Sequence, residues 1–118
     1  MKTEHARELV ARERARIEAA LAELDGELRD EGRLERQQTG EYEDAGSNLA
    51  AEAVSAALAA NLREQLDAVV RAEERLAEGT YGKSVESGLP IPDERLEVEP
   101  LAERTIEEQR LYEMNGPG

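Results

Sequence analysis

The sequence lacks cysteine, tryptophan and phenylalanine altogether and has only three tyrosines among its 118 residues. The absence of cysteine excludes disulfides and thiolate metal ligands. The absence of large aromatic side chains leaves leucine, valine, isoleucine and alanine to build the core, which favours packed helices over a thick β-sandwich. The length predicts a single domain with a modest core.

Basic residues are also scarce. The chain has 15 lysines and arginines against 28 aspartates and glutamates, which gives a formal net charge of −13. A strongly acidic surface repels phosphate, so direct binding to DNA or RNA is disfavoured and a basic protein partner is favoured. Both signs of charge alternate along the first two thirds of the chain, as in solvated helices rather than in a disordered acidic tail.

Long apolar runs are missing as well. Residues 1–20 are charged throughout and lack the apolar core of a signal peptide. No stretch approaches the roughly 20 apolar residues that cross a bilayer. The sequence therefore predicts a soluble, cytoplasmic protein without a membrane segment.

The motifs of enzyme chemistry are absent from the sequence. It contains no phosphate-binding loop, no nucleophile elbow and no pair of catalytic acids beside a histidine. The only histidine, His5, lies near the N-terminus, where we expect a surface residue rather than a general base or a ligand. We therefore expect a protein that is not an enzyme and uses no cofactor.

Two long stretches have the apolar spacing of amphipathic helices. The first runs from Thr3 to about Gln38, and its stripe consists of Val10, Ile17, Leu21, Leu24 and Leu28. The second runs from about Ser47 to Glu78, and its stripe consists of Val54, Leu58, Leu62, Leu66, Val69 and Leu76. A single helix cannot remove its own apolar stripe from water, so we expect the two helices to pack on each other along these stripes.

The expected fold class is therefore all-α, with residues 1–78 forming a long antiparallel coiled-coil hairpin whose tip lies at about residues 39–48. Alanines between the leucines let two backbones approach closely, which also leaves self-association open. Residues 79–118 should form a second, loop-rich module. We expect a short strand or hairpin around Arg95–Leu101 and a C-terminal helix from near Pro100 to Asn115.

The segment "GTYGKSVESGLPI", residues 79–91, resembles the C-terminal zinc finger of the DksA/TraR family, regulators that bind bacterial RNA polymerase through its secondary channel. Family members typically carry G-T-Y-G-x-C-x-x-C-G-x-P-I, and a second C-x-x-C pair further on. "ERLAEGTYG", residues 74–82, also matches the family's exit from its second long helix. The resemblance covers residues 40–110 and implies a helical hairpin joined to a small zinc-finger-like module.

This resemblance maps the four cysteine positions onto Ser84, Ser87, Thr105 and Glu108, and residues 88–104 have the expected length between the two pairs. Neutral hydroxyls replace thiolates poorly, and one carboxylate does not hold zinc alone. We therefore expect a degenerate finger that folds without a metal, its serines and threonine bonded to turn backbone. A hard cation held by acidic residues of the module, namely Glu86, Glu107 and Glu108, is a weaker alternative to a solvated acidic face.

The resemblance also assigns a role to the hairpin tip, which in this family presents acidic residues, usually as D-x-x-D-x-A, near the catalytic magnesium of the polymerase. Counting back from Gly79 without gaps places Glu41 and Asp44 at the acidic positions and Gly46 at the alanine. Tyr42 lies between them, as either a partner contact or a cap packed on the hairpin. The residues alone favour solvated acids that stabilise the start of the second helix, and the functional interpretation of Asp44 depends on the resemblance.

Two functions follow as hypotheses. The first is a transcription regulator that binds RNA polymerase through the secondary channel, with the hairpin tip near the catalytic magnesium. The alternative is a non-catalytic structural or protein-interaction module on the same scaffold that no longer binds polymerase.

Overall fold

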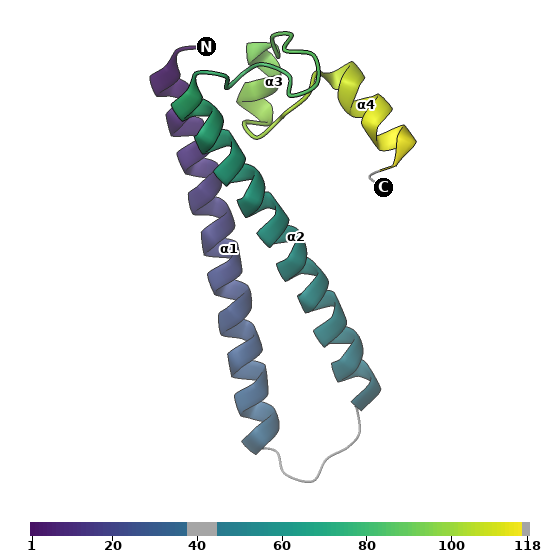
Figure 1. Ribbon diagram of the computed structural model, residues 1–118. Coiled ribbons are helices and arrows are strands. Elements are labelled where there is room, and N and C mark those ends of the chain that lie inside the picture. The colour runs from purple at the N-terminus through teal and green to yellow at the C-terminus, as the bar shows by residue number, and fades with distance from the viewer. Residues whose placement is uncertain (38–44, 117–118) are drawn as a thin grey trace. The chain divides into compact units, whose positions relative to one another are not determined.

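The computed structural model describes residues 1–37 and 45–116, with side chains for residues 1–26 and 49–116 (Figure 1). It contains four helices, which are α1 (Thr3–Gln37), α2 (Ala45–Glu78), α3 (Asp93–Val98) and α4 (Ile106–Asn115). No strand occurs in the described residues, where the β pairing consists of one isolated bridge between Lys83 and Pro90. The predicted all-α class and the two long helices of a hairpin are confirmed.

The described chain groups into two compact units. The first unit comprises residues 1–13 and 68–118, and the second comprises residues 14–67. Each unit contains part of both long helices, because the start of α1 and the end of α2 pack together with the C-terminal residues. The predicted boundary at residue 78 stays a prediction.

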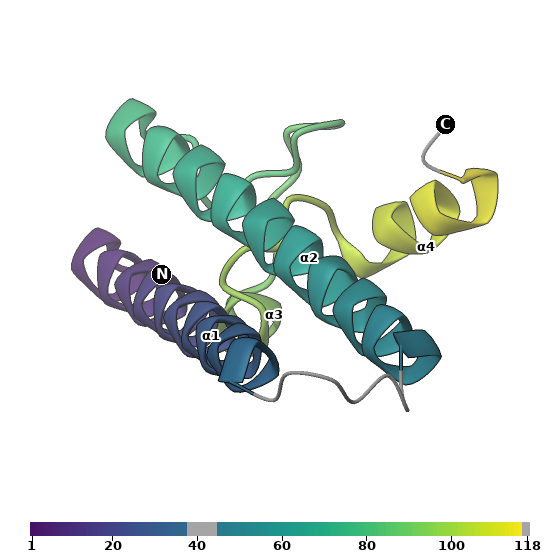
Figure 2. The ribbon, with the colours of Figure 1, turned by 90° about the horizontal axis from the view of Figure 1, so that it is seen from below.

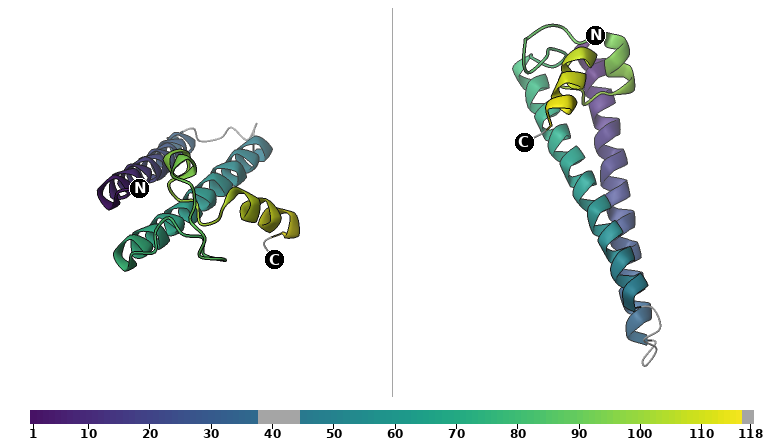
Figure 3. Two further views of the ribbon diagram at one scale, coloured as in Figure 1. Left: turned by 90° about the horizontal axis from the view of Figure 1, so that it is seen from above. Right: turned by 90° about the vertical axis from the view of Figure 1, so that its right-hand side faces the viewer.

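Most of the buried apolar side chains in the described residues belong to the first unit. In Figures 1 and 3, the start of α1 and the end of α2 lie side by side, with α3 close to them. The buried apolar side chains of this unit are Ala6, Leu9, Val10, Val69, Ala72, Ile91 and Leu96. Alanines on both long helices permit a close approach, and the larger residues fill the remaining space. This core fixes the end of α2, from which the following loop starts.

Two predictions for the C-terminal module are wrong. The alternating run from Arg95 to Leu101 is not a strand, because most of it forms α3, with Pro92 at the N-cap and acidic residues in the first turn. The C-terminal helix begins at Ile106 rather than near Pro100. Pro100 is buried in the preceding turn, and Thr105 supplies the side-chain cap that starts α4.

The second unit contains antiparallel stretches of α1 and α2 (Figure 2). Among its described side chains, Ile17 and Ala59 are the buried apolar ones. Arg16 Nη2 donates to Gln65 Oε1 at 3.1 Å from one helix to the other. The predicted stripe is confirmed at Ile17. It is wrong at Val54 and Leu58, which are exposed, because Ala59 takes the buried position on α2.

Coiled-coil packing of the two helices stays a prediction.

Among the described helices, none combines the length and the apolar character that spanning a membrane requires.

Candidate functional site

The loop of residues 79–91, called the knuckle below, leaves the end of α2 in a series of tight turns. Ser84 N donates to Leu89 O at 2.8 Å, Gly88 N donates to Ser84 O at 2.9 Å, and Ile91 N donates to Gly82 O at 2.8 Å. Gly82 has a φ of +86°, a value that L side chains rarely adopt, so glycine is required at this turn. These bonds fold the segment back on itself.

Two serine side chains of the knuckle bond to its own backbone. The Ser84 hydroxyl oxygen accepts from Glu86 N at 3.1 Å and from Ser87 N at 3.3 Å, and the residue is only 5% exposed. The Ser87 hydroxyl oxygen accepts from Leu89 N at 3.3 Å. The expectation that these serines bond to turn backbone is therefore confirmed.

The first turn of α4 is closed by a reciprocal capping box. Glu108 N donates to the Thr105 hydroxyl oxygen at 3.2 Å, and Thr105 N donates to Glu108 Oε1 at 2.9 Å. Such a pair satisfies two backbone donors that would otherwise lack a partner in the helix. The spacing of Thr105 and Glu108, three residues apart, is what the capping box requires.

The structure brings the four predicted finger positions close together, since Thr105 and Glu108 are hydrogen-bonded and the hydroxyls of Ser84 and Ser87 lie near the Glu108 carboxylate. We call Ser84, Ser87, Thr105 and Glu108 the hydroxyl–carboxylate cluster. The backbone hydrogen bond from Thr105, together with hydrogen bonds from the side chains of Ser84, Ser87 and Thr105, lowers the pKa of Glu108 to about 2. Each of these donors favours the ionised carboxylate. The carboxylate thus joins the knuckle to the start of α4.

The donors of this cluster do not fit zinc. Three of the four side chains are neutral hydroxyls, whereas zinc sites in proteins use thiolate, imidazole or carboxylate ligands. The single carboxylate already accepts hydrogen bonds from backbone and hydroxyl groups. The alternative cation ligands Glu86, Glu107 and Glu108 do not form a metal-binding group in the described part of the chain.

A second polar cluster, which the sequence did not predict, joins the last turns of α2 to the knuckle. Arg71 donates to both carboxylate oxygens of Glu103 at 3.0 Å, and Arg75 donates to one of them at 3.1 Å. The Glu103 carbonyl oxygen accepts from Val85 N at 2.9 Å. Glu103 thereby connects the last turns of α2 to the knuckle.

The balance of charge and burial around Glu103 favours its ionised form. Burial opposes ionisation, but the hydrogen bond from Arg71 and the positive charges of Arg71, Arg75 and Arg104 outweigh it and lower the pKa of Glu103. The i, i+4 spacing of Arg71 and Arg75 places both on one face of the helix, which was the available sequence signal. Nothing local in the sequence indicates their partner 28 and 32 residues away.

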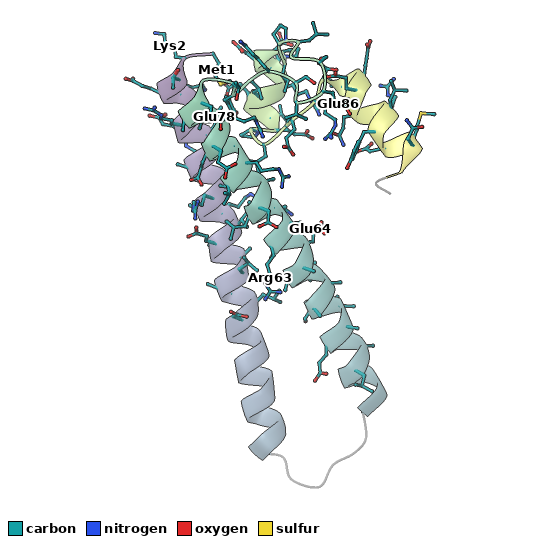
Figure 4. All side chains as sticks on the ribbon, in the orientation of Figure 1. Met1, Lys2, Arg63, Glu64, Glu78 and Glu86 are labelled. Carbon is teal, nitrogen blue, oxygen red and sulfur yellow. The ribbon has the colours of Figure 1, made fainter. Side chains whose placement is uncertain are left out.

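Arg104 forms a third link, between the knuckle and α4. Its guanidinium carbon lies 3.9 Å from the ring centroid of Tyr112. Its Nε lies 3.2 Å from Glu86 Oε1, an ion pair without hydrogen-bond alignment, and Figure 4 labels Glu86 in the loop beside α4. The neighbouring Tyr81 hydroxyl donates to Pro100 O at 2.7 Å. These contacts link the knuckle, α4 and the turn that contains Pro100.

The predicted tip residues are not placed by the structure. Glu41, Tyr42 and Asp44 lie outside the described residues. Gly46 belongs to the first turn of α2, a stretch for which the structure describes the backbone alone. The tip site stays a prediction.

No family model matches the chain. Its structure is similar to that of the transcription factor DksA2 from Pseudomonas aeruginosa, with a TM-score of 0.80 and 29% sequence identity over 98% of this chain and 86% of that chain. The chain has a DksA-like fold. The function of this structural neighbour also agrees with the expectation of a protein that is not an enzyme.

A curated relative matches over a shorter stretch. General stress protein 16O of Bacillus subtilis is 47% identical over 47 residues, which is 40% of this chain and 29% of that protein. The match therefore spans less than a third of the relative's length.

Proposed function

We propose that the chain is a transcription regulator that binds RNA polymerase. The observation that carries this proposal is the likeness to a transcription factor across 98% of the chain. The hydroxyl–carboxylate cluster supports it, because Thr105 and Glu108, at two of the finger positions that the resemblance predicts, are hydrogen-bonded to each other. The net charge of −13 favours a protein partner over the nucleic acid itself. We place this function in the cytoplasm, where the polymerase acts.

In this proposal the hairpin enters the secondary channel of the polymerase. Glu41 and Asp44 then lie near the catalytic magnesium, with Tyr42 and Gly46 beside them at the tip. Carboxylates in that position change the electrostatic field at the metal and its neighbouring elements without taking part in a chemical step. The knuckle would lie at the rim of the channel, folded without zinc.

Binding of the purified chain to the core RNA polymerase of its host tests the proposal. The variant Asp44→Asn removes one predicted tip charge, and Glu43→Gln is the matched control because it removes a neighbouring charge outside the predicted motif. We expect tight binding by the wild type and by both variants. We also expect loss of the effect on transcription for Asp44→Asn alone.

The possible results separate two functions. A hairpin with its tip deleted should bind less tightly if the tip enters the channel. Absence of binding by the wild type at micromolar concentrations would overturn the proposal and favour an interaction module that has lost the polymerase. Equal effects of Asp44→Asn and Glu43→Gln on transcription would overturn the assignment of the tip residues.

A further inference from the structure

One side of α2 in the second unit is apolar and uncovered. Leu49 is 67% exposed, Val54 is 61% exposed and Leu58 is 53% exposed, although all three are residues that normally belong in a core. Ala50, Ala53 and Ala57 are also exposed. A helix has about 3.6 residues per turn, so these six residues share one side of it. We call them the α2 face.

The α2 face is free of charge in a protein that is otherwise highly charged. From Leu49 to Leu62, the one charged residue is Glu52, and the helical repeat places it on the opposite side of the helix. Charged residues resume at Arg63 and Glu64, which Figure 4 labels on α2. Charged residues make up 36% of the whole chain, so this stretch differs sharply from the rest.

The residues of the face are arranged almost symmetrically along the helix. The segment "LAAEAVSAAL", residues 49–58, has a leucine at each end followed inward by two alanines, with Ala53 and Val54 at its centre. In an antiparallel pair of identical helices related by a two-fold axis at this centre, Leu49 of each copy meets Leu58 of the other. The alanines between them permit a close approach of the two backbones.

We propose that the α2 face binds the same face of a second copy of this chain, as an antiparallel helix pair centred between Ala53 and Val54. The charge of the molecule favours this partner over a basic one. A basic partner is attracted by carboxylates, and this face offers none. Two copies that each carry a net charge of −13 repel one another elsewhere, and a charge-free face reduces that repulsion where they meet.

The pair should be weak. Its contact covers about three helical turns, which is small against the roughly 800 Å² per partner of a standard interface. We therefore expect dissociation in the micromolar range or above. This inference does not depend on polymerase binding.

Sedimentation of the full chain from micromolar to millimolar concentration tests the proposal. We expect the mass to rise with concentration from 13.0 kDa toward twice that value. Ala53→Glu places like charges next to the two-fold axis and should raise the dissociation constant at least about tenfold. Ala56→Glu is the matched control, because Ala56 is also exposed but lies at the edge of the α2 face, next to Leu49 in the helical repeat and farther from the axis, so it should raise the dissociation constant less than Ala53→Glu does.

Cysteines introduced one at a time measure the orientation of the two helices, because the chain has no cysteine that would form a competing disulfide. Ala53→Cys lies beside the axis and should form a disulfide between copies under mild oxidation, whereas Ala56→Cys should not. Ala57→Cys should also form no disulfide, because in an antiparallel pair the two introduced cysteines are separated by about 10 Å along the helix axis. That distance exceeds the roughly 7 Å limit between bridged Cα atoms.

Three results would overturn the proposal. The first is a mass that stays at 13.0 kDa throughout the concentration range. The second is an equal change of the dissociation constant by Ala53→Glu and Ala56→Glu. The third is a disulfide that forms as readily with Ala57→Cys as with Ala53→Cys. The last result would indicate a parallel pair. Protection of the α2 face by added polymerase in a chain that stays monomeric would identify the polymerase as the occupant instead.

Discussion

The two ends of α2 differ in how they use their apolar residues. Near its C-terminal end Val69 and Ala72 are 0% exposed, whereas nearer its N-terminal end Val54 and Leu58 are more than half exposed. All four residues are apolar. The difference is that the C-terminal end lies in a unit that also contains α3 and the knuckle, whereas the described residues of the other unit belong to α1 and α2. Burial of a helix residue therefore depends on how many other elements surround it.

The polar residues show the same contrast. In the first unit Glu103 and Glu108 accept several hydrogen bonds each and link separate elements of the chain. In the second unit Arg16 donates to Gln65 from one long helix to the other, and both side chains are largely in contact with solvent. We expect the first unit to lose stability through single substitutions more readily than the second.

The largest effect should come from Leu96→Ala, which removes a side chain that is only 1% exposed in the core of the first unit. Deleting it leaves a cavity, and we expect the free energy of unfolding to fall by about 2 to 5 kcal/mol. Leu58→Ala, on the exposed part of α2, is the matched control and should change it by no more than about 0.5 kcal/mol. Denaturant unfolding of dilute samples measures both. Equal losses would contradict the contrast between the two units.

A smaller effect should come from Glu103→Gln, which removes the carboxylate that Arg71 and Arg75 share. The two guanidinium groups then lose a charged acceptor, and we expect a loss of about 1 to 3 kcal/mol. Glu99→Gln removes the partner of Arg95 from a site whose carboxylate is 60% exposed, and should cost at most about 0.5 kcal/mol. A neutral result for Glu103→Gln would mean that burial of apolar residues alone holds the module on α2.

The smallest effect concerns pH. The pKa of Glu108 is about 2 in the folded chain, below the value of about 4.3 of an unfolded glutamate. Because the folded pKa is depressed, the stability that this carboxylate contributes is fully present above about pH 4.3 and is lost as the pH falls toward about 2.

Glu108→Gln tests this pH dependence, because the amide does not ionise. Its free energy of unfolding should fall less steeply between about pH 4 and pH 2 than that of the wild type. Glu107→Gln, which removes the exposed neighbouring carboxylate, should keep the wild-type slope. Identical slopes for the wild type and Glu108→Gln would show that Glu108 has no depressed pKa in the folded chain.

The frame of the knuckle was predictable from its residues. Glycines at the turns and Ser84, Ser87 and Thr105 beside backbone donors indicated a folded loop without a thiolate site, and the structure bonds all three hydroxyls to backbone N–H groups. Local spacing suffices for such bonds because donor and acceptor are two or three residues apart. The strand expected at Arg95–Leu101 was wrong, because alternation over a short apolar run does not distinguish a strand from a short helix.

The all-α class, the approximate lengths of α1 and α2, and the short-range bonds of the knuckle and the α4 cap follow from local sequence, because each depends on residues close together in the chain. Long-range packing sets which apolar residues are buried, the pairing of Glu103 with Arg71 and Arg75, and the position of Glu108 near Ser84 and Ser87. These contacts join residues about 20 to 30 positions apart. Periodicity places a residue on a face of its helix, but only the packing of elements determines what that face meets.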